Sequence, residues 1–283
     1  MTDYLDIEGG RIAYEETGTG PLVVLSHGIG DRRQAYRFLA PMLAQAGYRV
    51  VSADLRGHGE SSMGWTSVTG TEAITRTDIA GDLIALIRQL GGPAVIVGHS
   101  ISGGAATIAA AREPDLISGI IEIGPFTMPL KLSVSGLVRI RRYRQGLFRL
   151  GGMQVFHSLR LWMRYLDLAY PAKPADYADY MAALRAKLSE PGRMAEFMKT
   201  GKSTPADAAA QLASVASPAL IIMGTLDPDF PDPRAEAEAV AAAMPSGLAT
   251  VAMVGGAGHY PHAQSPDEVA ALVLPFLKAH ARA

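Results

Sequence analysis

A single serine stands in the sequence where a predicted strand runs directly into a predicted helix. The segment reads VIVGHSISGG over residues 95–104, with Ser100 at the turn and Gly98 two residues before it. A sharp strand-to-helix turn lifts a serine hydroxyl above the edge of a sheet, and the helix N-terminus favours negative charge beside it. Glycine suits such a turn because a Cβ would crowd the backbone. These features predict a nucleophile at Ser100, but they also fit an ordinary serine cap of a helix.

A serine hydroxyl needs a base to become a nucleophile, and an acid to orient that base. Of the seven histidines, His259 follows a glycine-rich turn directly after the last predicted strand. Asp227 comes just after another predicted strand, where α/β sheets place ligand sites, and Asp229 and Asp232 are nearby alternatives. The chain order serine, aspartate, histidine is that of a hydrolytic triad on such a sheet. The sequence therefore favours covalent catalysis by Ser100, with His259 as base and Asp227 as acid.

The elements that must position these residues alternate along the chain. Short apolar runs are followed by longer segments with helical spacing, which is typical of a mostly parallel sheet with crossover helices. Strands are predicted over residues 11–16, 21–26, 48–53, 93–97, 118–123, 218–223 and 248–254. Helices are predicted over residues 35–46, 79–90, 101–112 and 234–244, with a last helix that ends near residue 278. This pattern predicts an α/β fold with helices on both faces of the sheet.

The alternation stops between residues 126 and 212. This stretch contains helical patterns with clustered aromatic and methionine side chains, and it contains no run typical of a buried strand. We expect a helical lid inserted into one α/β core. Residues 1–125 and 213–283 would then form the core, and residues 126–212 would form the lid.

Four motifs, in this order, resemble the α/β-hydrolase superfamily over almost the whole chain. They are HGIG at residues 27–30, DLRGHGES at residues 54–61, GHSIS at residues 98–102 and GH at residues 258–259. The resemblance implies the α/β-hydrolase fold, which has a mostly parallel central sheet, helices on both faces and an inserted lid. No metal or organic cofactor is implied, and we expect none, because an activated serine would do the work.

The resemblance gives each candidate residue a role. Ser100 would attack the substrate carbonyl, and His259 would take its proton and pass it to the leaving group. Asp227 would hold the imidazole in the right tautomer. The backbone N–H groups of Ile29 and Ile101 would form the oxyanion hole, in which the loss of one donor costs about 10²–10³ in rate.

One position departs from the family pattern. The turn usually reads G-x-S-x-G, but Ser102 stands at its last position here, and Gly103 and Gly104 follow. Turns of the form G-H-S-x-S resemble those of the branch that contains plant butenolide receptors and a bacterial stress-signalling hydrolase. Ser102 therefore leaves open a receptor or signalling protein with slow hydrolysis.

The nucleophile separates some chemistries of this superfamily from others. Haloalkane dehalogenases and epoxide hydrolases carry an aspartate at the turn, so Ser100 argues against both. The same three residue types serve esterases, carbon–carbon bond hydrolases and thioesterases. We expect hydrolysis of carboxylic esters through an acyl-enzyme, with carbon–carbon and thioester cleavage as alternatives.

Residues near the nucleophile and in the lid predict the substrate pocket. The aromatic and methionine side chains of the lid would form either a wall for small to medium apolar groups or the lid's own core. The candidate substrate-binding residues are Ile29, His99, Trp162 and His262. Arginines and lysines of the lid offer an alternative, the recognition of a substrate carboxylate.

The composition limits the other functions of the chain. The formal net charge of −1 gives no electrostatic case for nucleic acid or an anionic membrane as partner. The absence of cysteine excludes a thiolate nucleophile, a disulfide and a cysteine metal site. The first residues do not resemble a signal peptide, and the apolar runs are shorter than the roughly 18 residues of a membrane span. We expect a cytoplasmic monomer or homodimer that acts on a small-molecule ester.

Overall fold

Short runs of aliphatic residues form an eight-stranded sheet. The computed structural model describes residues 1–282. The strands are β1 (Asp3–Ile7), β2 (Gly10–Thr17), β3 (Leu22–Ser26), β4 (Arg49–Ala53), β5 (Ala94–His99), β6 (Ile117–Ile123), β7 (Ala219–Gly224) and β8 (Ala249–Val254). Every residue of β3, β5, β6 and β7 is buried, which is typical of parallel strands covered on both faces.

The order of the strands brings particular loops together. In space the order is β1-β2-β4-β3-β5-β6-β7-β8, and only the β1–β2 and β2–β4 pairs are antiparallel. The last residue of β3, Ser26, lies opposite Gly98 of β5. The loop after β3 and the turn after β5 therefore start side by side at the carboxyl edge of the sheet. Ligand sites of α/β proteins occur at such an edge.

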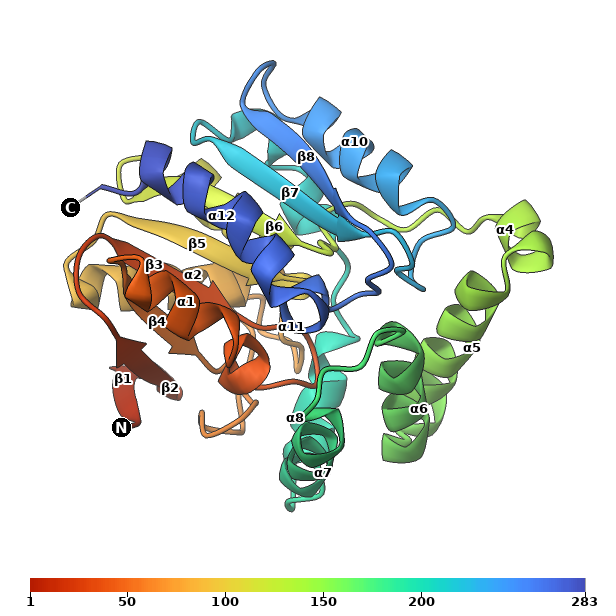
Figure 1. The fold of residues 1–283 in the computed structure, drawn as a ribbon. Helices are drawn as coiled ribbons and strands as arrows, with labels where there is room; N and C mark the ends of the chain where they lie inside the picture. The colour runs from red at the N-terminus through yellow and green to blue at the C-terminus, as the bar shows by residue number, and fades with distance from the viewer. Residues whose placement is uncertain (283) are drawn as a thin grey trace.

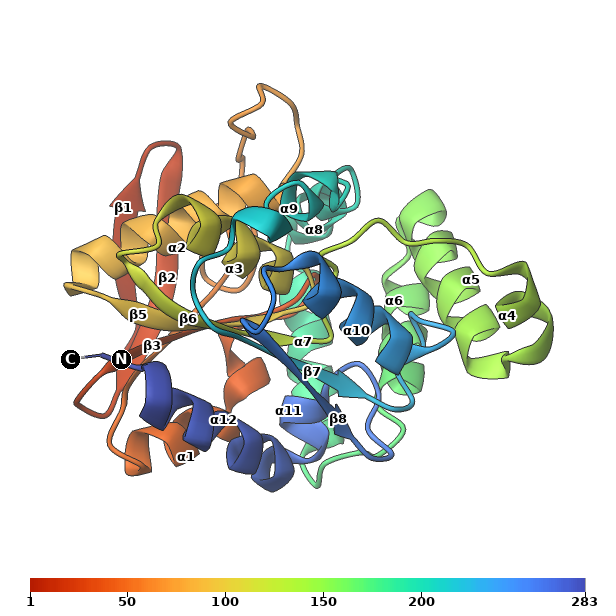
Figure 2. The same ribbon diagram turned by 90° about the horizontal axis from the view of Figure 1, so that it is seen from above.

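Helices cover the two faces of the sheet (Figure 2). On one face lie α1 (Leu39–Gln45) and α12 (Pro266–His280), and on the other lie α2 (Arg76–Leu90), α3 (Ile101–Arg112) and α10 (Pro233–Ala243). Each face has its own hydrophobic core. The start of α2 is set by a capping box between Thr75 and Asp78, and its end by Gly91 with φ +79°.

Six further helices lie between β6 and β7, and we call residues 134–209 the helical insert. They are α4 (Val134–Arg139), α5 (Arg141–Phe156), α6 (Leu159–Ala169), α7 (Tyr177–Leu188), α8 (Arg193–Thr200) and α9 (Ala206–Ala209). Figure 1 shows most of them set to one side of the sheet. One face of α6 is buried in a third hydrophobic core. The division into a core and a lid domain of residues 126–212 stays a prediction.

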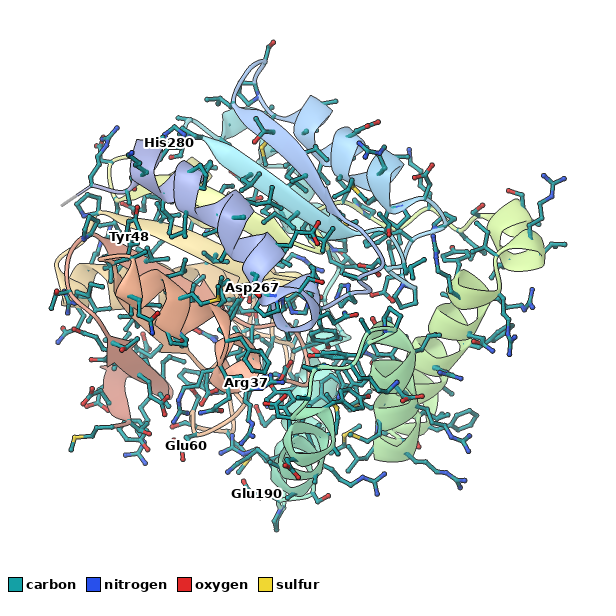
Figure 3. The ribbon with its side chains drawn as sticks, in the orientation of Figure 1. Arg37, Tyr48, Glu60, Glu190, Asp267 and His280 are labelled. Atoms are coloured by element: carbon teal, nitrogen blue, oxygen red, sulfur yellow. The ribbon has the colours of Figure 1, made fainter. Side chains whose placement is uncertain are left out.

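Contacts between charged and aromatic side chains fasten the insert to the core. Arg37, labelled in Figure 3, forms an ion pair with Asp176, with 2.5 Å between Nε and Oδ2. Its guanidinium also lies 4.0 Å from the centre of the Tyr180 ring. The hydroxyl of Tyr180 in turn donates to the carboxylate of Asp31 in the core. Burial raises the pKa of that carboxyl to about 6.

The structure differs from the predicted elements at three places. The segment predicted as one helix over 35–46 consists of a 3₁₀ turn, η1 (Arg33–Tyr36), followed by α1. The last helix is preceded by a separate short one, α11 (Pro261–Gln264). Strand β1 was not predicted, because it lies at the edge of the sheet and only Leu5 in it is buried. Within residues 1–282, no helix is both long enough and apolar enough to cross a membrane.

Candidate active site

Ser100 has the backbone conformation of a sharp strand-to-helix turn. Its φ of 56° and ψ of −118° lie where residues with a Cβ are uncommon. The turn is held by a hydrogen bond from the Ser100 N–H to the carbonyl of Ile123, and a Cβ at Gly98 would lie 2.2 Å from the carbonyl oxygen of Ser102. The Ser100 side chain makes no capping hydrogen bond. This separates the two interpretations of the sequence, because a capping serine bonds a free N–H of the first turn.

Ser102, the departure from the family pattern, ties the helix to the neighbouring loop. Its fully buried hydroxyl donates to the carbonyl of His27 at 2.6 Å and accepts from the Ser26 hydroxyl at 2.9 Å. These bonds connect the start of α3 to the end of β3. A neighbouring side chain packs closely against α3 at Gly104, where a Cβ would lie 2.8 Å from Cδ of Arg76. Ser102 therefore has a structural role that a glycine would lack.

Two carboxylates face His259, which lies in the loop between β8 and α11. Its Nδ1 is 2.7 Å from Oδ2 of Asp227 and 3.4 Å from Oδ2 of Asp229, and all three side chains are buried. The Tyr165 hydroxyl of α6 donates to Asp229 at 2.5 Å. The third acidic alternative, Asp232, caps α10 through the N–H of residue 235. Asp227 is therefore the hydrogen-bonded partner of His259, and Asp229 is a second buried acid beside it.

The charges of this group influence one another. Burial lowers the pKa of His259, but Asp227 and Asp229 raise it more strongly, so the pKa lies above its usual value. Burial raises the pKa of Asp229, and the negative charge of Asp227 raises it further. The charge of His259 lowers this pKa, but the net result is a pKa above the usual value. Because a carboxylate only accepts, Nδ1 carries the proton in its bond to Asp227. This leaves Nε2 of neutral His259 free to accept a proton.

The same three side chains could also be metal ligands: Asp227, Asp229 and His259. One donor atom from each lies within 4.8 Å of the others. Two ligands of a tetrahedral ion with bonds near 2.1 Å are separated by roughly 3.4 Å. The 2.7 Å contact between His259 and Asp227 is shorter than this and has the length of a hydrogen bond. The arrangement fits a histidine–carboxylate pair better than a metal site.

Ser100 and His259 line one small pocket, whose cavity volume is about 80 Å³. The core contributes Ile29, Ile101 and Phe126 among others, and the insert contributes Leu150, Trp162, Tyr165 and Thr200. Trp162 is fixed there because its Nε1–H donates to the carbonyl of Gly30 at 3.2 Å. Within residues 1–282 no hydrogen bond joins Ser100 to the imidazole of His259, although both side chains face the same cavity. The pocket can hold a small apolar group beside the serine hydroxyl.

The predicted oxyanion donors are the backbone N–H groups of Ile29 and Ile101. Both residues line the pocket, and neither N–H donates to an acceptor among the residues that the structure describes. The loop that carries Ile29 is held in place by a hydrogen bond from the Gly30 N–H to Nε2 of His58 at 3.1 Å. A Cβ at Gly28 would lie 3.0 Å from Cβ of Ser100, so this loop passes directly beside the serine. The pocket lining therefore includes two residues whose backbone N–H groups donate no hydrogen bond within residues 1–282.

Two of the four predicted substrate-binding residues are not part of the pocket lining. Ile29 and Trp162 line the pocket, but His99 and His262 do not. His99 is fully buried with Nε2 2.9 Å from the carbonyl oxygen of His259, and the fully buried His262 ring lies 4.8 Å from the His99 ring. Burial lowers the pKa of both histidines. The expectation of substrate contact is corrected for both, because they pack among the residues that support the His259 loop.

Several pocket residues were not predicted as site residues, and Arg76, Phe126 and Tyr260 are among them. Phe126 and Tyr260 are aromatic residues that follow β6 and His259, and no motif distinguishes them from core residues. Arg76 is the first residue of α2. The helix was predicted to begin at residue 79, so only the structure places this cation in the first turn, where the helix dipole opposes it.

The chain is similar to known proteins over most of its length. A family model described as "Alpha/beta hydrolase family" matches residues 23–272. The chain is 29% identical to 2-(acetamidomethylene)succinate hydrolase of Mesorhizobium japonicum, over 96% of this chain and 94% of that protein. It is 28% identical to epoxide hydrolase A of Mycobacterium tuberculosis, over 96% of each. A thermophilic esterase from Thermogutta terrifontis has a similar fold, with a TM-score of 0.73 and 23% identity over all of both chains.

Proposed function

Because this chain belongs to the alpha/beta hydrolase family, we propose that it is a serine hydrolase that cleaves carboxylic esters through an acyl-enzyme on Ser100. One observation carries this proposal. The hydroxyl of Ser100 is free of any helix-capping bond, at a strained turn, in the same pocket as a histidine whose Nδ1 is held 2.7 Å from Asp227. A nucleophile, a base and an orienting acid are the groups that acyl transfer needs.

The proposed reaction has two steps. Ser100 Oγ attacks the ester carbonyl while Nε2 of His259 takes its proton, and the same nitrogen then gives the proton to the leaving alcohol. Water, activated by His259, hydrolyses the acyl-enzyme in the second step. Asp227 stabilises the imidazolium in both steps. The free N–H groups of Ile29 and Ile101 would bind the oxyanion, at a helix N-terminus that favours negative charge.

The side chain at the turn argues for ester rather than epoxide chemistry. Several relatives are named epoxide hydrolases, but this chain carries Ser100 where that class has an aspartate. A hydroxyl nucleophile suits attack on a carbonyl carbon. We therefore propose a carbonyl substrate and not an epoxide.

A second candidate is cleavage of a bond other than an ester in a substrate that bears carboxylates. It is favoured by the similarity, over nearly the full length of both chains, to a protein named for 2-(acetamidomethylene)succinate. The same three residues would serve this reaction and the carbon–carbon and thioester alternatives. The products distinguish them, because only ester cleavage releases an alcohol together with the acid.

A series of p-nitrophenyl esters tests the proposed function. The small cavity beside Ser100 predicts the highest kcat/KM for short acyl groups and a fall for long ones. Styrene oxide serves as the epoxide control and should not be opened. If Ser100→Ala retained the turnover of the wild type, or if styrene oxide were the better substrate, the proposed function would be wrong.

A further inference from the structure

Arg76 differs from the other buried arginines of this protein. It lines the pocket of Ser100 with 5% of its surface exposed, and within residues 1–282 no carboxylate oxygen lies within 4.0 Å of its guanidinium. Each of the other buried arginines has a carboxylate partner: Arg33 pairs with Asp54, Arg56 with Asp82 and Arg193 with Glu190. Arg76 is thus a buried cation without an anion.

The contacts of Arg76 leave part of its guanidinium free. Nε donates to the carbonyl of Phe126 at 2.7 Å, and Nη1 makes a long contact of 3.4 Å to the Ser203 hydroxyl. Arginine has five donors in a fixed fork, so these bonds use less than half of them. Asp207, whose charge raises the pKa of Arg76, accepts instead from the backbone and hydroxyl of Thr77.

The fold makes room for Arg76 at this place. A Cβ on Gly104 of α3 would lie 3.0 Å from Nε of Arg76, so a glycine is needed where the side chain crosses the neighbouring helix. Burial lowers the pKa of Arg76 to about 10, which still leaves it charged at neutral pH. A buried charge without a partner is costly for the folded state. When such a group lines a pocket beside a nucleophile, a functional role explains why it is there.

We propose that Arg76 binds a carboxylate of the substrate, so that the natural substrate is an ester that carries a free carboxylate. The proposal rests on the proposed function for the identity of the site. A guanidinium and a carboxylate match as two planar groups that form parallel hydrogen bonds. The sequence suggested such recognition from cations of the lid, but this cation comes from α2 in the core. The other ionisable groups that line the pocket are Asp229, His259, Tyr165 and Tyr260.

Binding to the inactive Ser100→Ala variant tests the proposal without turnover. Calorimetry would compare monomethyl succinate and monomethyl glutarate with methyl levulinate, which is matched in length to the succinate ester but has a methyl ketone in place of the carboxylate. We expect the better of the two acids to bind on the order of ten to a hundred times more tightly than the neutral ester, as for a charged hydrogen bond. Equal affinities, or no binding of either acid, would overturn the proposal.

Substitution of Arg76 assigns the effect to this side chain. Adding Arg76→Gln to Ser100→Ala should abolish the preference for the acids and leave methyl levulinate unchanged, while Arg76→Lys should retain part of it. The matched control is Arg142→Gln, because Arg142 also bonds a backbone carbonyl but lies outside the pocket lining. Arg76→Gln should not lower the Tm, since it removes an unpaired buried charge. A lower Tm with equal weakening of all three ligands would make Arg76 a structural residue only.

The two proposals can fail separately. If Ser100 of the wild type reacts with a fluorophosphonate while the acids show no preference, the serine hydrolase stands and the role of Arg76 is wrong. If the acids bind through Arg76 but Ser100 does not react, the proposed function fails and the carboxylate site stands.

Discussion

The pocket of Ser100 has two walls: a core wall, formed by residues such as Ser100 and Ile29, and an insert wall, formed by residues such as Trp162 and Tyr165. Different kinds of contact hold these two walls in place. On the core side, Ser100 and Ile29 follow strand ends, and backbone hydrogen bonds and close-packed glycines fix their positions. On the insert side, Trp162 and Tyr165 come from one helix and are held by side-chain bonds to Gly30 and to Asp229. Substitutions can therefore change the insert side of the pocket while Ser100 and Ile29 stay in place.

The largest expected effect separates the two acids beside His259. Asp227→Asn should lower kcat/KM for a short p-nitrophenyl ester by about 10³–10⁴, because an amide at this place favours the wrong tautomer of the imidazole. Asp229→Asn, at the longer distance, should cost orders of magnitude less. Steady-state kinetics of the two matched variants measure this difference. The reverse order of losses would make Asp229 the catalytic acid.

Trp162→Ala should change selectivity on the insert side. The side chain is 1% exposed and packs on the rings of Tyr165 and Phe197, so its removal should lower the free energy of unfolding by about 3–5 kcal/mol. The enlarged cavity should move the best acyl group to a longer chain. Phe148→Ala, on an exposed position of the same insert, is the control and should change neither property. If Trp162→Ala showed the same dependence of kcat/KM on acyl chain length as the wild type, this wall would not limit the length of the acyl group.

The smallest effect concerns pH. Attack by Ser100 needs neutral His259, so kcat/KM should rise with pH through the pKa of this histidine, which lies above its usual value. Asp229→Asn removes one of the two carboxylates that raise this pKa. The rising limb of the profile should therefore move to lower pH in the variant. A shift to higher pH would contradict the charge that we assign to Asp229.

Features fixed by local sequence could be predicted, whereas features that depend on packing between distant elements could not. Buried strands, the turn at Ser100 and the chain order of the serine, aspartate and histidine were predictable, because local apolar patterns and glycines determine them. The helical character of the insert was predictable for the same reason. The presence of Arg76 in the pocket lining, and the absence of His99 from it, depend on which elements pack side by side, and no local pattern encodes this. The role of Ser102 needed the position of His27 in the neighbouring loop.

The most direct test of the account is reaction of the protein with a fluorophosphonate, followed by intact-mass analysis of the wild type and of Ser100→Ala. The account predicts one adduct on the wild type, mapped to Ser100, and none on the variant. Ser102→Ala serves as the control at a second buried serine, which lies in the first turn of α3, and should still be labelled at Ser100. A wild type that does not react, or an adduct that persists in Ser100→Ala, would contradict an activated Ser100.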